Sequence, residues 1–218
     1  MNMESKRHAD FAYDRLIEMI AAGKLKPGTR LPTVPLAEEM GISRTPVIEA
    51  LKRMQGEGIV VFKTSNGAWL ADPTKKEIGD VYFVRATLEG LALELGFPFI
   101  TPMVLIELKR HAELEKEYYA TGDRVKFLKA GLDFHRELAE CCPNRYLATC
   151  INSSLATTFA YVLLLEFRNE NNKGAKRSAP AHKDLMDAII AGDKAGAVKM
   201  VQESLMEAFR CTFEDMPD

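Results

Sequence analysis

The sequence of 218 residues lacks the features of secreted, disulfide-stabilised and membrane-spanning proteins. Its four cysteines form no CxxC pair, and none has a histidine at zinc spacing, so we expect neither a disulfide framework nor a structural zinc site. The N-terminus contains no apolar signal-peptide run, and no uninterrupted apolar run approaches the ~18 residues of a membrane span. We therefore expect a cytoplasmic protein with reduced cysteines and no membrane contact.

The chain also has little net charge and no common catalytic motif. Its 29 Lys and Arg against 31 Asp and Glu give −2, which taken alone argues against a nucleic-acid partner. The charge is unevenly distributed, because residues 1–71 hold 10 basic and 8 acidic residues (+2), and residues 72–218 hold 19 and 23 (−4). A nucleophile elbow, an HExxH motif, a phosphate loop and a 20–50-residue repeat are all missing, so we expect no enzyme and no solenoid.

The first 71 residues change character every ten to fifteen positions, which indicates short elements joined by defined turns. An apolar stripe predicts a packing helix over 8–22 that stops at Gly23. The stripe consists of Tyr13, Leu16, Ile17 and Ile20. A short second helix carries Pro35 in its first turn and ends at Gly41, whose permissive backbone suits a tight turn between helices.

A third predicted helix, over residues 44–56, completes a helix-turn-helix pattern, with Ser43 or Thr45 as its cap. Its buried face is expected to hold Val47, Ala50, Leu51 and Met54. Its opposite face begins with Arg44, Thr45 and Ile48 and continues through Lys52 and Arg53. The second helix of this motif enters the major groove with its N-terminal side chains at base edges, so that opposite face is a candidate DNA-binding surface.

A β-hairpin is predicted directly after this helix, from Ile59–Phe62 and Ala68–Ala71 joined by a turn with an Asn-Gly signal. A hairpin in this place is a wing, and Lys63 with the backbone near Gly67 could reach phosphates or the minor groove. The alternative is an ordinary α+β domain of three helices and a hairpin whose charges form a solvated face.

Three segments, PGTRL, LAEEMGISRTPV and EAL…GEGIV, make the stretch from Tyr13 to Ala71 resemble the DNA-binding domain of the GntR family of bacterial transcription regulators. The resemblance implies a winged helix-turn-helix that contacts an operator through Arg30, Arg44, Thr45 and the wing at Gly67. The complete candidate set is Arg30, Thr33, Ser43, Arg44, Thr45, Ile48, Lys52, Lys63 and Gly67.

One position departs from the family pattern, because the family usually carries Arg where this chain has Ile48. Isoleucine removes a guanidinium that could bind phosphate or guanine, and it supplies an aliphatic group able to touch a thymine methyl. We expect operator binding that is weaker than the family norm or differently specified.

The second part of the chain reads as helix throughout, with breaks at Gly, Pro or Asn. We expect a linker over 72–77 and an all-helical domain over 78–218, so that the whole protein is mainly α. The predicted helices span residues 75–96, 101–121, 124–141, 145–168, 179–191 and 193–213. Such helices form an antiparallel bundle, in which ligand sites lie among inward-pointing polar residues.

Several polar residues fall on the apolar stripes of these helices: Arg85, His135 and His182, with Ser154 and Thr158 on a fourth stripe. A buried Arg85 needs an anionic partner, which could be Glu89 one turn on, a carboxylate of another helix, or an acidic ligand. Each residue also has a structural interpretation. The arginine could snorkel at a boundary, the histidines could be satisfied core residues, and the hydroxyls could bond back to their own helix.

Four segments resemble the FCD class of effector domain found in many GntR regulators: RATLE, FHRELAECCPNRYL, AHKDLMDAI and GDKAGAVKMVQESL. That resemblance implies a divalent metal held by an Asp and three His, which in turn holds a carboxylate effector. His135 and His182 match two ligands, but the Asp position is Gly131 and the last His position is Ser204. Asp133 faces away from His135. We therefore expect no cofactor, or at most a weak Zn or Ni site.

We expect a homodimeric regulator, a repressor, that binds a pseudo-palindromic operator and senses a small organic acid. The candidate effector-binding residues are Arg85, His135, Ser154, Thr158, His182 and Ser204. Two alternatives stay open: a DNA-binding dimer with a vestigial pocket and no ligand, and a small metal-dependent hydrolase.

Overall fold

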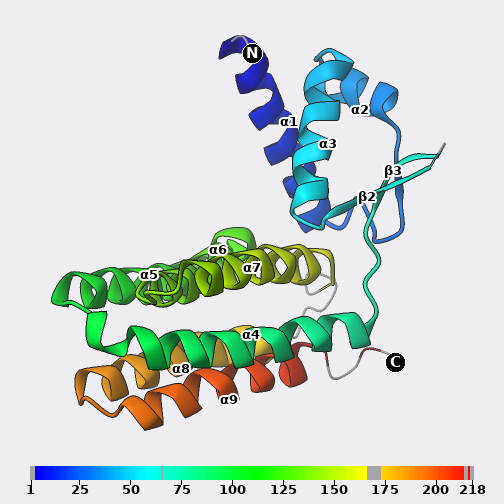
Figure 1. Cartoon of the computed structure of the whole chain (residues 1–218). Helices are drawn as coiled ribbons and strands as arrows, with labels where there is room; N and C mark the ends of the chain where they lie inside the picture. Colours follow the sequence, from blue (N-terminus) through cyan, green and yellow to red (C-terminus); the bar gives the residue numbers. More distant parts are fainter. Residues whose placement is uncertain (1–2, 65, 166–172, 214–215, 217–218) are drawn as a thin grey trace. The chain divides into compact units, whose positions relative to one another are not determined.

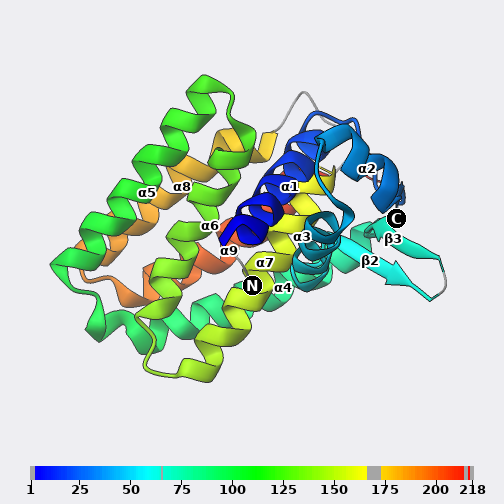
Figure 2. The same ribbon diagram turned by 90° about the horizontal axis from the view of Figure 1, so that it is seen from above.

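The computed structural model describes residues 3–64, 66–165, 173–213 and Met216. Two compact units can be distinguished: one holds Met1–Pro73 with Ala160–Arg168, the other Thr74–Phe159 with Asn169–Asp218. The described elements are helices apart from three short strands, all in the first unit, so the predicted fold class is confirmed (Figures 1 and 2).

The first unit contains three helices and one small antiparallel sheet, as expected for a winged helix-turn-helix. The elements are α1 (Met3–Ala21), β1 (Arg30–Leu31), α2 (Thr33–Met40), α3 (Arg44–Gly56), β2 (Val60–Lys63) and β3 (Gly67–Leu70). The sheet order is β1-β3-β2, and Arg30 pairs with Trp69 across the outer ladder. The hairpin is confirmed to within one residue, but β1 was not predicted, because two residues are too few to show a period.

The core of the first unit consists of the predicted faces of α1 and α3. The stripe residues Tyr13, Leu16, Ile17, Ile20, Val47, Ala50, Leu51 and Met54 are all at most 5% exposed. A polar contact also joins these helices, because the Tyr13 hydroxyl donates to Glu57 at 2.7 Å and the Arg53 guanidinium lies 3.9 Å from the Tyr13 ring. Burial, reinforced by Glu57, raises the pKa of the Tyr13 hydroxyl, which stays protonated.

The second unit is a bundle of helices whose bounds follow the predictions closely. It holds α4 (Lys75–Gly96), the short 3-10 helix η1 (Phe97–Phe99), α5 (Pro102–Thr121), α6 (Arg124–Glu140), α7 (Arg145–Leu165, of which residues 160–165 are grouped with the first unit), α8 (Lys173–Ile190) and α9 (Lys194–Phe213). Residues 166–168 of the predicted fourth helix lie outside the described residues. The start of α8 was predicted wrongly at 179, because Pro180 suits a first turn, whereas the helix begins six residues earlier and contains that proline.

Packing within the bundle places α4 against α9 and α6, α5 against α6 and α8, and α8 against α9. The core cluster is formed by Ala86, Leu93, Leu108, Phe134, Leu138, Leu185, Met186, Ile189, Ala197, Val201 and Leu205. One helix of the described residues, α7, is long and apolar enough to cross a membrane by composition, yet 56% of its most apolar window is buried within the protein. This is the composition of a core helix.

The domain boundaries stay a prediction, and α4 already begins at Lys75, inside the predicted linker.

Gly96 lies where α4 approaches the end of α6 most closely. A Cβ at this position would lie 3.0 Å from the backbone carbon of Cys141 and 3.1 Å from the nitrogen of Cys142. Backbone cannot move aside as a side chain can, so Gly96→Ala should lower the free energy of unfolding by about 1–3 kcal/mol despite the better helix propensity of alanine. Chemical denaturation measures this value. The control Glu94→Ala, at an exposed site on the same helix, should stay within about 0.5 kcal/mol of the parent.

Candidate functional site

The N-terminal end of α3 presents the predicted DNA-binding side chains on the surface of the first unit. Ser43 occupies the N-cap position, but its side chain makes no capping hydrogen bond, and the backbone N–H groups of the first turn lack that partner. Arg44 and Thr45 are exposed, and Ile48 is half-buried one turn later. Free N–H groups at a helix N-terminus are suited to a phosphate oxygen.

The basic residues of β1 and α3 fall into two groups. Arg53 pairs with Asp10 and with Glu57, each at 3.3 Å, so it ties α3 to α1 and is not the free DNA contact that its place on the outer face suggested. Arg30, Arg44 and Lys52 are exposed and have no ion pair among the residues that the structure describes. Thr33, at the first position of α2, is half-buried.

The wing is organised around Trp69. The Lys63 ammonium lies 4.4 Å from the centre of the Trp69 ring, and the indole N–H donates to the carbonyl of Asn66 at 3.1 Å. Gly67 has φ = +79°, a conformation that favours glycine. Lys63 and Gly67 are both exposed, so the predicted wing contacts are on the surface.

In the second unit, a chain of ionisable side chains lies within the helical core. Arg85 of α4 is 2% exposed and donates from Nε to Oε1 of Glu89 at 2.8 Å, so its partner is the glutamate one turn on and it does not snorkel. The other oxygen of Glu89 lies 2.6 Å from Nδ1 of His135 on α6, at ion-pair distance but without the alignment of a hydrogen bond. Nη2 of Arg85 is buried and has no hydrogen-bond partner among the described residues.

The chain continues from α6 to α8 and α5. Nε2 of His135 lies 3.2 Å from Nε2 of His182, and Nδ1 of His182 lies 2.8 Å from Oε2 of Glu115. The ring of Phe134 stacks on His182 with the centroids 4.1 Å apart. Side chains from α4, α6, α8 and α5 are thereby joined by polar contacts, and we call Arg85, Glu89, His135, His182 and Glu115 the buried polar chain.

Burial and charge set the ionisation of this chain. Burial by itself would raise the pKa of Glu89, but Arg85 and His135 outweigh it and lower that pKa to about 2. Burial lowers the pKa of His135, against the opposite effect of Glu89. Glu89 is therefore ionised at neutral pH, and the Arg85 guanidinium is its main counter-charge.

The remaining candidate effector residues are not joined to the buried polar chain by their hydroxyl groups. The hydroxyls of Ser154, Thr158 and Ser204 donate to the carbonyls of Cys150, Ser154 and Val201, each within its own helix. Such bonds satisfy the hydroxyl locally. Thr158 is buried, and Ser154 and Ser204 are half-buried.

The residues at the place of the implied metal do not fit a closed metal site. Two imidazole Nε2 atoms face one another, but no group of three His, Cys, Asp or Glu among the described residues could hold a metal ion. Asp133 pairs with Arg136 on the surface of α6 and does not substitute for the missing carboxylate. Structural zinc sites use four ligands, so two histidines supply half of what such a site requires.

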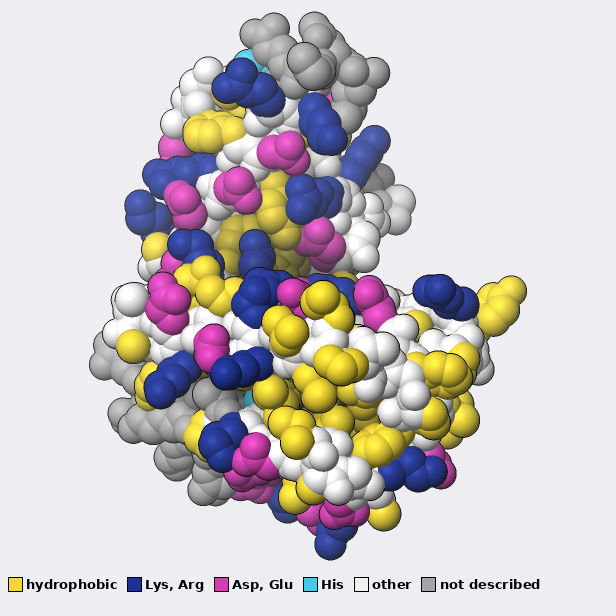
Figure 3. Space-filling view, turned by 90° about the vertical axis from the view of Figure 1, so that its left-hand side faces the viewer, with side chains coloured by type: hydrophobic (Ala, Val, Ile, Leu, Met, Phe, Trp, Pro, Cys, Tyr) yellow, Lys and Arg dark blue, Asp and Glu magenta, His cyan; other side chains and the backbone are white. Residues whose placement is uncertain are grey.

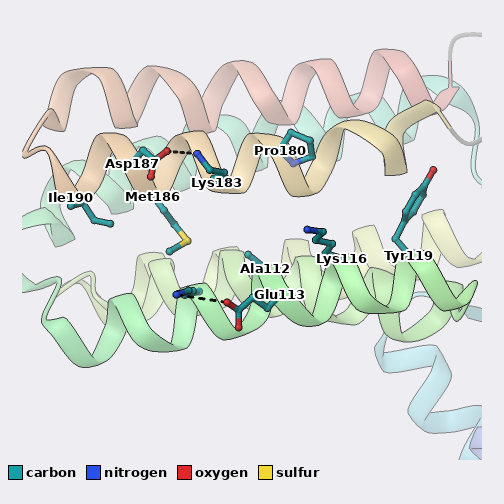
Figure 4. A pocket seen from close by; sticks show the side chains of 10 residues that line it. Ala112, Glu113, Lys116, Tyr119, Pro180, Lys183, Met186, Asp187 and Ile190 are labelled. Carbon is teal, nitrogen blue, oxygen red and sulfur yellow. Dashed lines mark hydrogen bonds and ion pairs between the residues drawn. The ribbon is translucent and has the colours of Figure 1, made fainter.

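A groove of about 710 Å³ lies between α5 and α8 (Figure 4), and none of the predicted effector residues lines it. Its lining residues are Lys109, Ala112, Glu113, Lys116, Tyr119, Pro180, Lys183, Met186, Asp187 and Ile190. Lys109 pairs with Glu113 and Lys183 with Asp187, whereas Lys116 has no partner among the described residues. The groove is mostly apolar with a polar rim, and its volume is typical of small-molecule sites.

Glu115 is the member of the buried polar chain that sequence reasoning missed. It is 1% exposed, and it follows Leu108 and Ala112 on the inner face of α5. A carboxylate on an apolar stripe is the same signal that identified Arg85 and His135, so the pattern was present in the sequence. Its partnership with His182, 67 residues later, becomes visible only in the folded chain.

Comparison with known proteins agrees with both units. Residues 8–69 match the family of bacterial regulatory proteins named gntR, and residues 80–206 match the FCD domain. The solved structure of a putative GntR transcriptional regulator from Rhodococcus sp. RHA1 superposes with a TM-score of 0.75 at 21% identity, covering 99% of this chain and all of that one.

The chain is also similar in sequence to transcription regulators of bacilli. A gluconate operon transcriptional repressor of Bacillus licheniformis is 30% identical over 188 residues, which are 85% of this chain and 76% of the relative. An HTH-type transcriptional regulator of Bacillus subtilis is 30% identical over 136 residues, and the match spans 62% of this chain and 61% of that regulator. With both of its domains matched, the chain belongs to the GntR family of DNA-binding transcription regulators, in the branch that carries a C-terminal FCD domain.

Proposed function

We propose that this regulator is a cytoplasmic homodimeric repressor, which binds a pseudo-palindromic operator and releases it when a small organic acid binds to the helical unit. The observation that carries the proposal is the buried guanidinium of Arg85, whose Nη2 has no hydrogen-bond partner among the described residues. A buried donor without a partner costs about 1–3 kcal/mol, and an anionic ligand would remove that cost.

DNA recognition is assigned to the surface around the N-terminus of α3. Arg44, Thr45 and Ile48 would face base edges, and Arg30, Lys52 and the wing at Lys63 and Gly67 would face phosphates. Thr33 and Ser43 flank the same surface. The exposed cations without ion pairs support this assignment, because each can approach a phosphate without first breaking an internal contact. With only +2 on residues 1–71, specific contacts should contribute more than bulk charge.

Ile48→Arg should strengthen operator binding about tenfold at fixed salt and change the preferred base at one position of each half-site, because arginine can bind guanine bidentately. The operator is first selected from random DNA, and affinities are then measured by fluorescence anisotropy. The control Gln55→Arg adds the same charge at an exposed site near the other end of α3. An equal gain in both variants, with unchanged base preference, would show that Ile48 is not at the base edges.

The proposed dimer uses the exposed apolar side of α4. Figure 3 shows hydrophobic side chains gathered on a face of the helical part. On α4, Phe83, Val84, Leu91 and Leu95 are 64%, 43%, 44% and 41% exposed. With the half-buried Leu88, positions 84, 88, 91 and 95 follow the spacing of a helix–helix seam, and a two-fold axis would place this seam against its own copy.

Leu91→Lys should weaken dimerisation by about 30-fold or more, because it introduces two facing charges at the centre of the seam. Sedimentation equilibrium of the full chain measures the monomer–dimer constant. Ile106→Lys is the matched control, since Ile106 is 59% exposed on α5 and outside the seam. A dimer that tolerates Leu91→Lys but not Ile106→Lys would place the interface on α5.

The effector site is proposed at Arg85 without a resident metal, or with only a weak Zn or Ni ion completed by water or effector at His135 and His182. Gluconate is the first ligand to test, because the Bacillus licheniformis relative is named for the gluconate operon. A second location is the groove between α5 and α8, where Lys116 has no partner among the described residues and where Ala112 of α5 and Met186 of α8 supply apolar surface (Figure 4).

Two variants separate these locations. Gluconate at 100 times its Kd should stabilise the protein by about 2.7 kcal/mol in thermal unfolding, and the uncharged polyol sorbitol should not. Arg85→Lys keeps a positive charge beside Glu89 but removes the planar fork, so it should abolish the gluconate effect, whereas Lys116→Gln should leave it unchanged. The reverse pattern would place the ligand in the groove. Intact operator binding with no stabilisation by any carboxylate would favour a DNA-binding dimer without an effector.

A further inference from the structure

We propose that Glu115 of α5, in the space left by Gly131, replaces the metal as the connection that holds His182 in the helical core. The inference rests on the proposed absence of a resident metal. The small size of Gly131 then leaves room for the Glu115 carboxylate, which holds His182 in the absence of a metal.

The first support is steric. A Cβ built on Gly131 would lie 2.7 Å from Oε1 of Glu115, closer than real Cβ contacts, and 3.8 Å from Cε1 of His182. An aspartate at 131 would therefore meet the Glu115 carboxylate before it reached His135 or His182. Glycine here has an ordinary helical backbone, so its small size, and not its conformational freedom, is what the site uses.

The second support is the direction of the hydrogen bond. Glu115 accepts from Nδ1 of His182, whereas the Nε2 atoms of His182 and His135 face each other. The Glu115 carboxylate is thus on the far side of the imidazole from the place where two Nε2 atoms could share an ion. Glu115 orients the ring but does not restore the missing third ligand.

The third support is the set of helices that become connected. A metal bound at positions 131, 135, 182 and 204 would connect α6, α8 and α9. The buried polar chain instead connects α5, α8, α6 and α4 through contacts of 2.8 Å, 3.2 Å and 2.6 Å. On α9, Ser204 bonds to the carbonyl of Val201 in its own helix. The polar contacts of His135 and His182 therefore reach α4 and α5, where a metal would have connected them to α9.

Glu115 is thus a positioning residue for His182. Glu115 is only 1% exposed. A carboxylate that is removed from water needs a hydrogen-bond donor or an opposite charge beside it, and His182 supplies one. The ring of Phe134 stacks on the face of the His182 imidazole and limits how far that imidazole can tilt. Removing the carboxylate should free the ring to rotate, and adding a carboxylate at 131 should force Glu115 out of its place.

Metal titration of the chelator-treated protein tests whether Glu115 takes the place of a metal beside His182. Isothermal titration with Ni²⁺ and with Zn²⁺ is applied to the parent, to Gly131→Asp, to the double variant Gly131→Asp with Ser204→His, and to the triple variant that adds Glu115→Ala to that double variant. We expect stoichiometric sub-micromolar binding only in the triple variant, because only there are all four ligands present without the competing carboxylate. Gly131→Asp should also lower the midpoint of thermal unfolding by about 5 °C without metal.

The possible failures are distinguishable. Stoichiometric sub-micromolar binding by the parent would overturn the proposed absence of a metal. Tight binding by the double variant of Gly131→Asp and Ser204→His with Glu115 retained, at unchanged thermal stability, would overturn only the claim that Glu115 occupies that space.

A second measurement keeps the proposal falsifiable if the triple variant does not fold. In protein with ¹⁵N-labelled histidine, NMR should show a slowly exchanging Nδ1–H of His182. The signal should disappear in Glu115→Ala, persist in Glu115→Gln, whose amide oxygen can still accept, and persist in the control Glu113→Ala, which lies on the exposed side of α5 and pairs with Lys109. Persistence of the signal in Glu115→Ala would overturn the role of Glu115.

Discussion

The helical unit depends on one electrostatic constraint: five ionisable side chains are buried together, and each is tolerable only because its neighbours are present. Arg85, Glu89, Glu115, His135 and His182 are all at most 8% exposed. Taking a charge out of water costs several kcal/mol, and removing one partner of a buried pair typically costs about 3–5 kcal/mol because the other charge is left uncompensated. The buried polar chain therefore joins α4, α5, α6 and α8 by contacts whose members depend on one another.

The DNA-binding unit, in contrast, keeps its charged side chains out of its core. Its core is apolar, and its structural ion pairs lie at the surface, where Arg53 is divided among Tyr13, Asp10 and Glu57. Exposed ion pairs contribute little to stability. The pairs of Arg53 nevertheless occupy a cation on the outer face of α3, and the pair with Asp10 connects α3 to α1. Arg44 and Lys52 of α3 and Arg30 of β1 stay exposed and without an ion pair among the described residues. The low total charge of the protein is thus compatible with a locally basic surface.

Much of this organisation was predictable from the sequence. The third helix is predictable at residues 44–56 because a proline in its first turn and an apolar stripe agree, although Ser43, at the N-cap position, makes no side-chain capping bond. Arg85, His135 and His182 were identified because a polar residue on an apolar stripe must find a partner. The strand β1 and the six early residues of α8 were missed, since the first has no period and the second runs through Pro180. Glu115 and the groove beside α5 depend on helices that are far apart in sequence, so pairing and shape could not be inferred from local pattern.

The change of ligands at Gly131 and Ser204 has a consequence for how a signal would leave the effector site. A connection that includes α4 involves the helix that begins at Lys75, two residues after Pro73, where the first segment of the DNA-binding unit ends. An anion bound at Nη2 of Arg85 would act on α4 directly and, through Glu89, on both histidines. Coupling requires a differential contact with an element that has two arrangements. In this protein α4 is the element that both meets the buried polar chain and adjoins the connection to the operator-binding domain.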